Sequence, residues 1–204
     1  MKNFLLLPLI VGSFVAVSVT AQDTSNATDR IEEVIVTAER RAESIQSVAV
    51  AVTAIDMAGI ESKSIGNILD VGRHVPNAVI INGTGPANSS RIYFRGIGED
   101  DSRNPDPAVG TYLDGIFMGR TIGGLLDVAD VAQIEVLRGP QGTMFGRNSN
   151  GGAIRVITVS PQNENTLSLT GGAGSDGRKM IKAVANLAIS EDTAFRVAIL
   201  DKQR

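Results

Sequence analysis

The sequence predicts an α+β fold, in which a glycine-rich domain with a small mixed sheet and short helices precedes the first two to three antiparallel strands of an incomplete outer-membrane β-barrel. Between residues 45 and 160, short β-branched runs alternate with turn residues and leave room for only short helices. Of the 22 glycines, 14 lie between Gly83 and Gly152, where they permit tight turns and close backbone approach. After residue 160, apolar and polar residues alternate along longer strands.

The first 21 residues have the composition of a secretory signal peptide. Lys2 supplies a charged start, and an apolar run extends from Phe4 to Val19 and ends in small residues. A retained membrane anchor is the alternative. The run is short for a bilayer, however, and Pro8 and Gly12 weaken it as a helix. We therefore expect export and cleavage after Ala21.

A flexible leader is expected at residues 22–44, and it contains a β-branched segment at residues 31–38. The segment consists of Ile31, Glu32, Glu33, Val34, Ile35, Val36, Thr37 and Ala38. Adjacent β-branched residues favour an extended strand. Two interpretations stay open: the segment is the first strand of the following sheet, or it is an exposed strand to which a partner adds a strand of its own.

The domain at residues 45–160 is expected to contain four strands, a hairpin and two short helices. The apolar runs predict strands at residues 48–55, 92–95, 134–138 and 153–159. Asp114 and Gly115 form the two-residue turn of a predicted hairpin at residues 111–118. A second short helix is expected at residues 125–131.

The first short helix is predicted from the spacing of Ile65, Ile68 and Leu69, which places them on one buried face. Ser62 or Ser64 can cap its amino end. A glycine and a proline, at residues 72 and 76, are expected to end it.

Residues 161–204 are predicted to form strands at 166–170, 179–189 and 194–201, with apolar side chains on one face and polar ones on the other. This alternation is typical of outer-membrane barrels, and an ordinary antiparallel sheet over a soluble core is the alternative. Three strands leave open edges, which hydrocarbon does not tolerate. We therefore expect an amino-terminal fragment or a truncated product of a larger barrel.

Composition excludes several function classes. Nineteen basic against 22 acidic residues give a net charge of −3, which argues against a nucleic-acid partner. The absence of cysteine excludes disulfides and thiolate-bound metals, and one histidine provides no metal cluster.

Sequence motifs for enzyme chemistry are also missing. Arg95-Gly96-Ile97-Gly98 is followed by acidic residues, which would repel a pyrophosphate. The acidic cluster at residues 99–101 with Asp106 has carboxylates that could hold Ca²⁺, but a solvated loop is favoured. We predict no catalytic residue, no metal and no cofactor.

Several motifs together resemble the TonB-dependent outer-membrane receptors, a family of iron-complex and nutrient transporters. Residues 31–38 resemble the TonB box of this family, and residues 46–53 resemble the opening of its plug domain, with Ala49 in place of the usual proline. Residues 93–98 and 109–115 resemble the middle of the plug. The most specific match is the long run Ile134–Arg147, which continues through Ala153 and Ile154.

The resemblance implies a function and a set of site residues. It implies that TonB pairs with residues 31–38 by strand addition, and that Arg95, Glu135 and Arg138 contact the barrel wall around the plug. It implies an outer-membrane location and energy-coupled uptake of a scarce small molecule, most closely a ferric siderophore or another iron complex. The alternatives are a stand-alone exported plug-like binding protein and a non-functional truncated receptor. An enzyme is the least favoured class.

Overall fold

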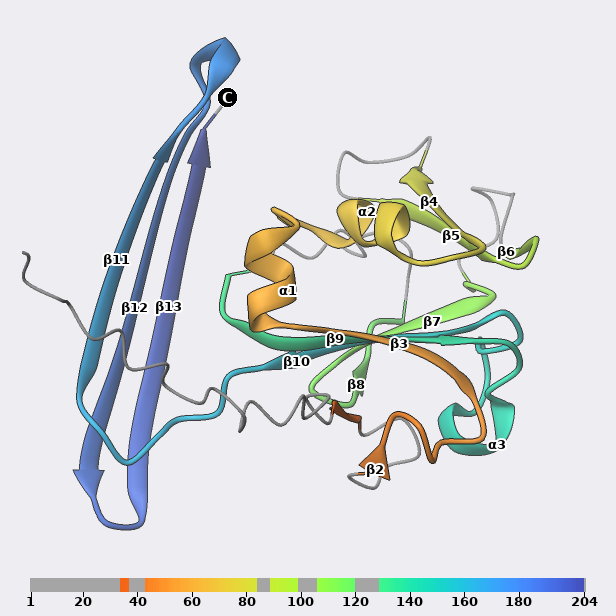
Figure 1. The fold of residues 1–204 in the computed structure, drawn as a ribbon, viewed down its shortest axis with the longest axis horizontal. Helices are drawn as coiled ribbons and strands as arrows, with labels where there is room; N and C mark the ends of the chain where they lie inside the picture. The colour runs from red at the N-terminus through yellow and green to blue at the C-terminus, as the bar shows by residue number, and fades with distance from the viewer. Residues whose placement is uncertain (1–33, 37–42, 84–88, 99–105, 120–128, 204) are drawn as a thin grey trace, which may run out of the picture. The chain divides into compact units, whose positions relative to one another are not determined.

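A computed structural model describes residues 34–36, 43–83, 89–98, 106–119 and 129–203 (Figure 1). The predicted signal peptide and most of the leader lie outside the described residues. The helices are α1 (Met57–Ser62), α2 (Ile68–Val71), α3 (Gly142–Phe145) and the 3₁₀ turns η1 (Gly72–His74) and η2 (Ser175–Gly177). The strands are β1 (Ile35–Val36), β2 (Glu43–Ser44), β3 (Ala51–Asp56), β4 (Ala78–Asn82), β5 (Ser90–Phe94), β6 (Ile97–Gly98), β7 (Val109–Leu113), β8 (Ile116–Phe117), β9 (Val131–Arg138), β10 (Gly152–Thr158), β11 (Thr166–Ala173), β12 (Lys179–Ser190) and β13 (Thr193–Gln203).

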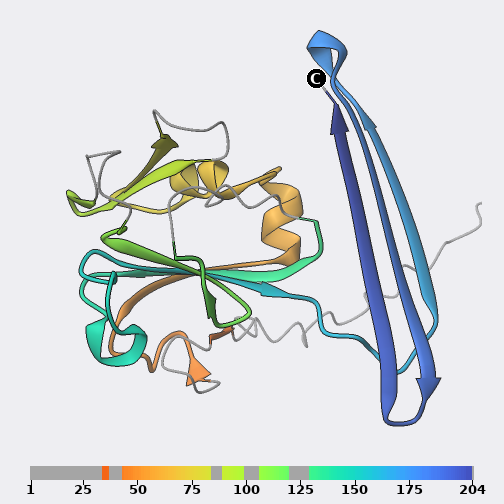
Figure 2. The ribbon, with the colours of Figure 1, turned by 180° about the vertical axis from the view of Figure 1, so that it is seen from behind.

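The centre of the glycine-rich domain is a five-stranded sheet in the order β3-β9-β10-β7-β8. Strands β10 and β7 pair in parallel and the other neighbours pair antiparallel, so the sheet is mixed, as predicted. Figures 1 and 2 show α1 and α2 on one face of this sheet and α3 with β2 on the other. Each face has a hydrophobic cluster: Ile134 and Val136 of β9 belong to one, and Leu137 belongs to the other. The sheet is therefore buried on both sides, and the predicted α+β class is confirmed.

The predicted first helix corresponds to α2, α1 is an additional helix before it that was not predicted, and the predicted caps are wrong. Asp56 caps α1 by accepting a hydrogen bond from Gly59 N at 2.7 Å, and Asn67 caps α2 by accepting one from Asp70 N at 3.3 Å. Ser62 is the last residue of α1, and Ser64 lies beyond it with a positive φ of 51°. An N-cap needs an extended backbone, which Ser64 does not have.

The predicted hairpin with the Asp114-Gly115 turn is present as β7 and β8. Asp114 and Gly115 have φ values of 48° and 84°, which a two-residue hairpin turn of the favoured type requires. The Asp114 carboxylate accepts hydrogen bonds from Thr158 N and Thr158 Oγ1, both at 2.8 Å. The turn is thereby fixed to the end of β10. The predicted helix at residues 125–131 falls largely outside the described residues, and Val131 begins strand β9.

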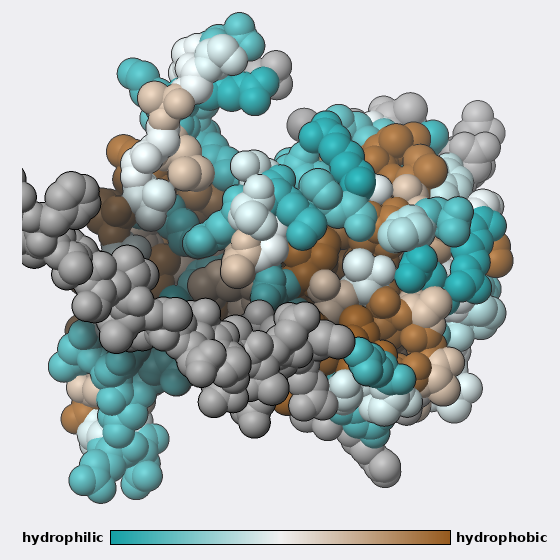
Figure 3. Space-filling model, viewed as in Figure 1, coloured by the Kyte–Doolittle hydropathy of each residue, from teal (hydrophilic) through white to brown (hydrophobic). Residues whose placement is uncertain are grey.

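A second sheet has the strand order β4-β5-β6. Buried side chains of β5 and of α2 pack in one hydrophobic cluster with side chains of the five-stranded sheet. Phe94 of β5 is fully buried, whereas Val79 and Ile81 of β4 are about half exposed. In Figure 3, hydrophobic patches alternate with hydrophilic ones over this part of the surface.

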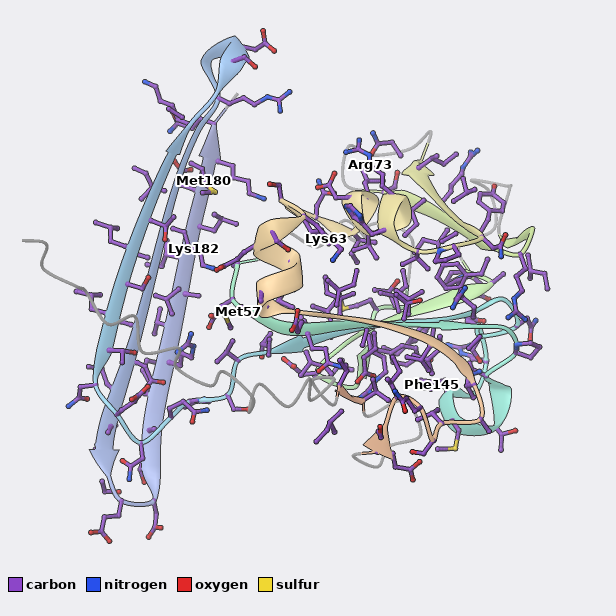
Figure 4. All side chains as sticks on the ribbon, viewed as in Figure 1. Met57, Lys63, Arg73, Phe145, Met180 and Lys182 are labelled. Atoms are coloured by element: carbon purple, nitrogen blue, oxygen red, sulfur yellow. The ribbon has the colours of Figure 1, made fainter. Side chains whose placement is uncertain are left out.

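Strands β11, β12 and β13 form a separate three-stranded antiparallel sheet. The register places eight exposed apolar side chains on one face: Leu167, Leu169, Ile181, Leu187, Ile189, Phe195, Val197 and Ile199. Met180 and Lys182 extend from β12 on the other face (Figure 4). The predicted alternation is confirmed. In the part of the chain that the structure describes, no helix is long and apolar enough to cross a membrane.

Candidate functional site

The described part of the segment at residues 31–38 forms strand β1. Ile31, Glu32, Glu33, Thr37 and Ala38 lie outside the described residues. Ile35 and Val36 pair antiparallel with β2, and Ile45 N donates to Val34 O at 3.0 Å. Val36 is fully buried, whereas Ile35 is 54% exposed.

Strand β1 packs against the five-stranded sheet through Val36. This side chain belongs to a cluster with Tyr112, Leu137 and Ala153, and Phe145 of α3 packs at its border (Figure 4). Tyr112 OH donates to Phe145 O at 3.0 Å, which ties α3 to strand β7. Full burial of a valine side chain stabilises the packed state by about 1.5–3 kcal/mol. In this structure, the middle of the predicted partner-binding segment is therefore docked.

A line of polar side chains runs from β1 into the sheet. Gln133 Nε2 donates to Ile35 O at 3.1 Å and to Glu135 Oε1 at 3.3 Å. Arg155 Nη1 of β10 donates to Glu135 Oε2 at 2.6 Å. The Glu135 side chain has no exposed surface and that of Arg155 is 14% exposed, so this is a buried ion pair.

The three residues predicted to contact a barrel wall lie in different environments. The fully buried Glu135 carboxylate pairs inside the domain with Arg155, so it has no exposed surface for a wall contact in this structure. Arg138 Nη1 donates to Pro76 O at 3.2 Å, and its buried Nε has no hydrogen-bond partner among the described residues. Arg95 follows β5 with a positive φ of 52°, and its backbone N–H donates to Asn77 O. The Arg95 side chain points toward Gly139, directly after Arg138.

One polar interaction that the sequence reasoning missed joins the glycine-rich domain to the segment that follows it, and a second one fixes the beginning of that segment. Arg196 of β13 binds both carboxylate oxygens of Asp130, at 2.6 and 2.8 Å. Asn186 of β12 is fully buried and holds the connecting segment, because it accepts from Gln162 N and donates to the carbonyls of Gln162 and Glu164. An asparagine inside an alternating strand was the only sequence signal for this contact.

The described residues do not form a catalytic or metal-binding arrangement. No group of three or more histidine, aspartate or glutamate residues that could hold a metal is found among them. Asp106 contacts Asn148 Nδ2 at 3.4 Å, and residues 99–101 of the same acidic cluster are outside the described part. The geometry is that of a short strand docked beside a buried ion pair.

The comparisons with known proteins identify the family. The family model described as the TonB-dependent receptor plug domain matches residues 44–153, and the chain belongs to this family.

Individual relatives agree with the family match. The vitamin B12 transporter BtuB of Vibrio vulnificus is 28% identical over 171 residues, which are 82% of this chain and 27% of the relative. The iron-regulated outer membrane virulence protein of Vibrio cholerae is 29% identical over 165 residues, 78% of this chain and 24% of the relative. Among solved structures, the ferric yersiniabactin uptake receptor FyuA of Yersinia pestis is similar with a TM-score of 0.68 and 26% identity, over 74% of this chain and 24% of the receptor.

These findings confirm the predicted family, the fold and the outer-membrane location. The three similar proteins named above are described as a transporter, an outer membrane virulence protein and an uptake receptor. The chain spans about a quarter of the length of the relatives it matches.

Proposed function

We propose that this chain takes part in energy-coupled uptake of a scarce nutrient across the outer membrane, with residues 45–160 as the plug and residues 31–38 as the TonB box. The observation that carries the proposal is the geometry of β1. This strand precedes a plug-family domain, has β2 as its one strand neighbour among the described residues, and exposes Ile35. Such a strand can accept a second neighbour through main-chain hydrogen bonds, which is how we propose that TonB binds.

The rest of the chain fits this proposal. Residues 1–21 would direct export, and residues 161–204 would begin the barrel, with the apolar face of β11–β13 toward lipid. Eight exposed apolar side chains on one face of a three-stranded sheet are a surface that water disfavours and hydrocarbon accepts. The polar faces of the same strands would then line the inside of the barrel.

We propose a ferric siderophore or another iron complex as the substrate. Support comes from two of the similar proteins, one described as iron-regulated and one as a ferric yersiniabactin uptake receptor. A vitamin B12 transporter is also among the relatives, so cobalamin is the competing substrate to include in a test.

Proline at position 35 tests the strand-addition proposal. Val34 O bonds to β2, so the backbone groups of Ile35 point to the opposite, free edge of β1. Ile35→Pro removes one N–H donor on that edge, while Ile35→Ala keeps the donor and serves as the matched control. The complete receptor would be tested in cells with a ferric catecholate, a ferric hydroxamate and cyanocobalamin.

With the probe that binds, Ile35→Pro is expected to abolish uptake and to leave surface binding unchanged, while Ile35→Ala transports normally. Normal uptake by Ile35→Pro would refute the strand-addition proposal. Tight binding of cyanocobalamin but of neither iron complex would refute the proposed substrate class and leave the coupling proposal intact.

A further inference from the structure

We infer that Gln133 caps the free edge of strand β1 and thereby sets how readily an incoming strand pairs with it. The inference rests on the proposed function of β1 as a strand acceptor, and it assigns Gln133 as a positioning residue for that step. It follows from three features of the structure: which backbone groups of β1 are already bonded, how the Gln133 amide is oriented, and what attaches β1 to the sheet.

The first feature is the carbonyl to which Gln133 binds. In an antiparallel pair, successive residues direct their backbone groups to opposite edges of a strand. Val34 O accepts from Ile45 N on the β2 side, so the N–H and C=O groups of Ile35 point to the free edge. Gln133 Nε2 donates to Ile35 O at 3.1 Å and therefore occupies an acceptor that an added strand would need.

The second feature is the orientation of the Gln133 amide. Its nitrogen carries two hydrogens, and its two acceptors are Ile35 O and Glu135 Oε1. Glu135 is itself fixed, because it is fully buried and paired with Arg155. The buried ion pair thus holds the amide with its donors toward β1, and it connects the free edge of β1 with strand β10.

The third feature is the attachment of β1 to the plug. The hydrogen bonds between β1 and β2 are local, since both strands precede β3, and they do not join β1 to the five-stranded sheet. Burial of Val36 and the Gln133 hydrogen bond do join it. Loss of the Gln133 bond should therefore weaken the docking of the strand as well as free its edge.

A thiol reporter can test the inference without substrate or TonB, because residues 1–204 contain no cysteine and any cysteine elsewhere in the complete receptor is first replaced by serine. Val36→Cys places a thiol at a fully buried position, so its rate of modification by maleimide measures how often β1 leaves the sheet. In the complete receptor in outer membranes, Gln133→Ala is expected to raise this rate about three- to tenfold, the effect of one neutral hydrogen bond. Gln133→Glu should raise the rate further, since a carboxylate cannot donate to Ile35 O and is repelled by Glu135.

Two controls separate this effect from general loosening. Gln162→Ala removes a glutamine side chain that follows the plug and donates to Ser160 O at the end of the plug, and it should leave the Val36→Cys rate unchanged. A cysteine at Val109, 1% exposed in the other hydrophobic cluster, should be modified at the same rate with and without Gln133→Ala. An unchanged rate at position 36, or an equal rise at positions 36 and 109, would overturn the inference.

The TonB step is tested separately with the purified carboxy-terminal domain of TonB and substrate-free receptor. Gln133→Ala is expected to tighten this binding by the same factor by which it raises the labelling rate. Faster labelling without any TonB binding, in the parent or the variant, would leave Gln133 as the docking residue of β1 and refute the proposed role of β1. If TonB binds the parent and the Gln133→Ala variant equally tightly although the variant is labelled faster, the inference that Gln133 caps the edge of β1 is refuted.

Discussion

The buried ion pair between Glu135 and Arg155 gives a prediction with a defined magnitude. Removing one partner of a buried pair destabilises a protein by about 3–5 kcal/mol, because the other charge stays in a low-dielectric interior. Arg155→Met leaves the fully buried Glu135 carboxylate without the guanidinium that lies 2.6 Å away. We expect a loss near 3 kcal/mol in the local stability of β9 and β10, because Gln133 still donates to the carboxylate.

Hydrogen exchange of the β9 and β10 amides measures this loss in the membrane-embedded receptor, since exchange reports local opening free energies. At about 1.4 kcal/mol per tenfold change, 3 kcal/mol corresponds to exchange roughly 100-fold faster. Arg155→Lys keeps the charge and loses mainly the fixed geometry of the guanidinium. The β9 and β10 amides of this variant should therefore exchange less than tenfold faster than those of the parent.

The double variant Glu135→Leu with Arg155→Met sharpens the test. Replacing a whole buried ion pair with apolar side chains is often neutral or stabilising, so most of the lost stability should return. Two results would refute the reasoning: an Arg155→Met effect below about 1 kcal/mol, or a double variant less stable than Arg155→Met alone. Either result would mean that removing Arg155 does not leave Glu135 as an uncompensated charge in a water-free interior.

Further substitutions test the backbone geometry and the connecting segment. Gly152→Ala should cost about 2–4 kcal/mol in the same exchange measurement, because its Cβ would overlap Leu137 O at a φ of +142°. Gly115→Ala, at a φ of +84° with open space around it, should cost only about 1 kcal/mol, and equal effects at the two glycines would contradict the steric argument. Asn186→Ala should cost about 1–3 kcal/mol and make residues 160–165 more sensitive to protease, whereas unchanged cleavage would show that Asn186 does not hold this segment.

Most of the long strands were predictable because their signals are local, whereas β4 was not predicted. The Asp114-Gly115 turn and the alternation in β11–β13 depend on neighbouring residues, and both are present in the structure. The helix caps were not predictable in the same way. Four residues near α1 and α2 can act as caps, and the backbone selects Asp56 and Asn67, which are extended, over Ser64, which has a positive φ.

The environment of Glu135 could not be predicted from its own strand. In β9, Ile134 and Val136 alternate with Gln133 and Glu135, which normally indicates one buried and one exposed face. The polar face is buried because a segment distant in sequence, which includes β1, Ile45 and Val48, covers that side of the sheet. Only the three-dimensional arrangement shows that Arg155 on the neighbouring strand compensates the charge.

The strand order also dictates when the plug can acquire its structure as the polypeptide emerges from the ribosome. Ala51 at the start of β3 lies opposite Arg138 at the end of β9 in the strand register, and β10 follows β9 in the chain. Until these later strands are available, β3 has no strand partner and β7 lacks β10, whereas the local pairs β4-β5, β5-β6 and β7-β8 need only residues already synthesised. The five-stranded sheet that buries both hydrophobic clusters therefore cannot close until β10, which ends at Thr158, has been synthesised.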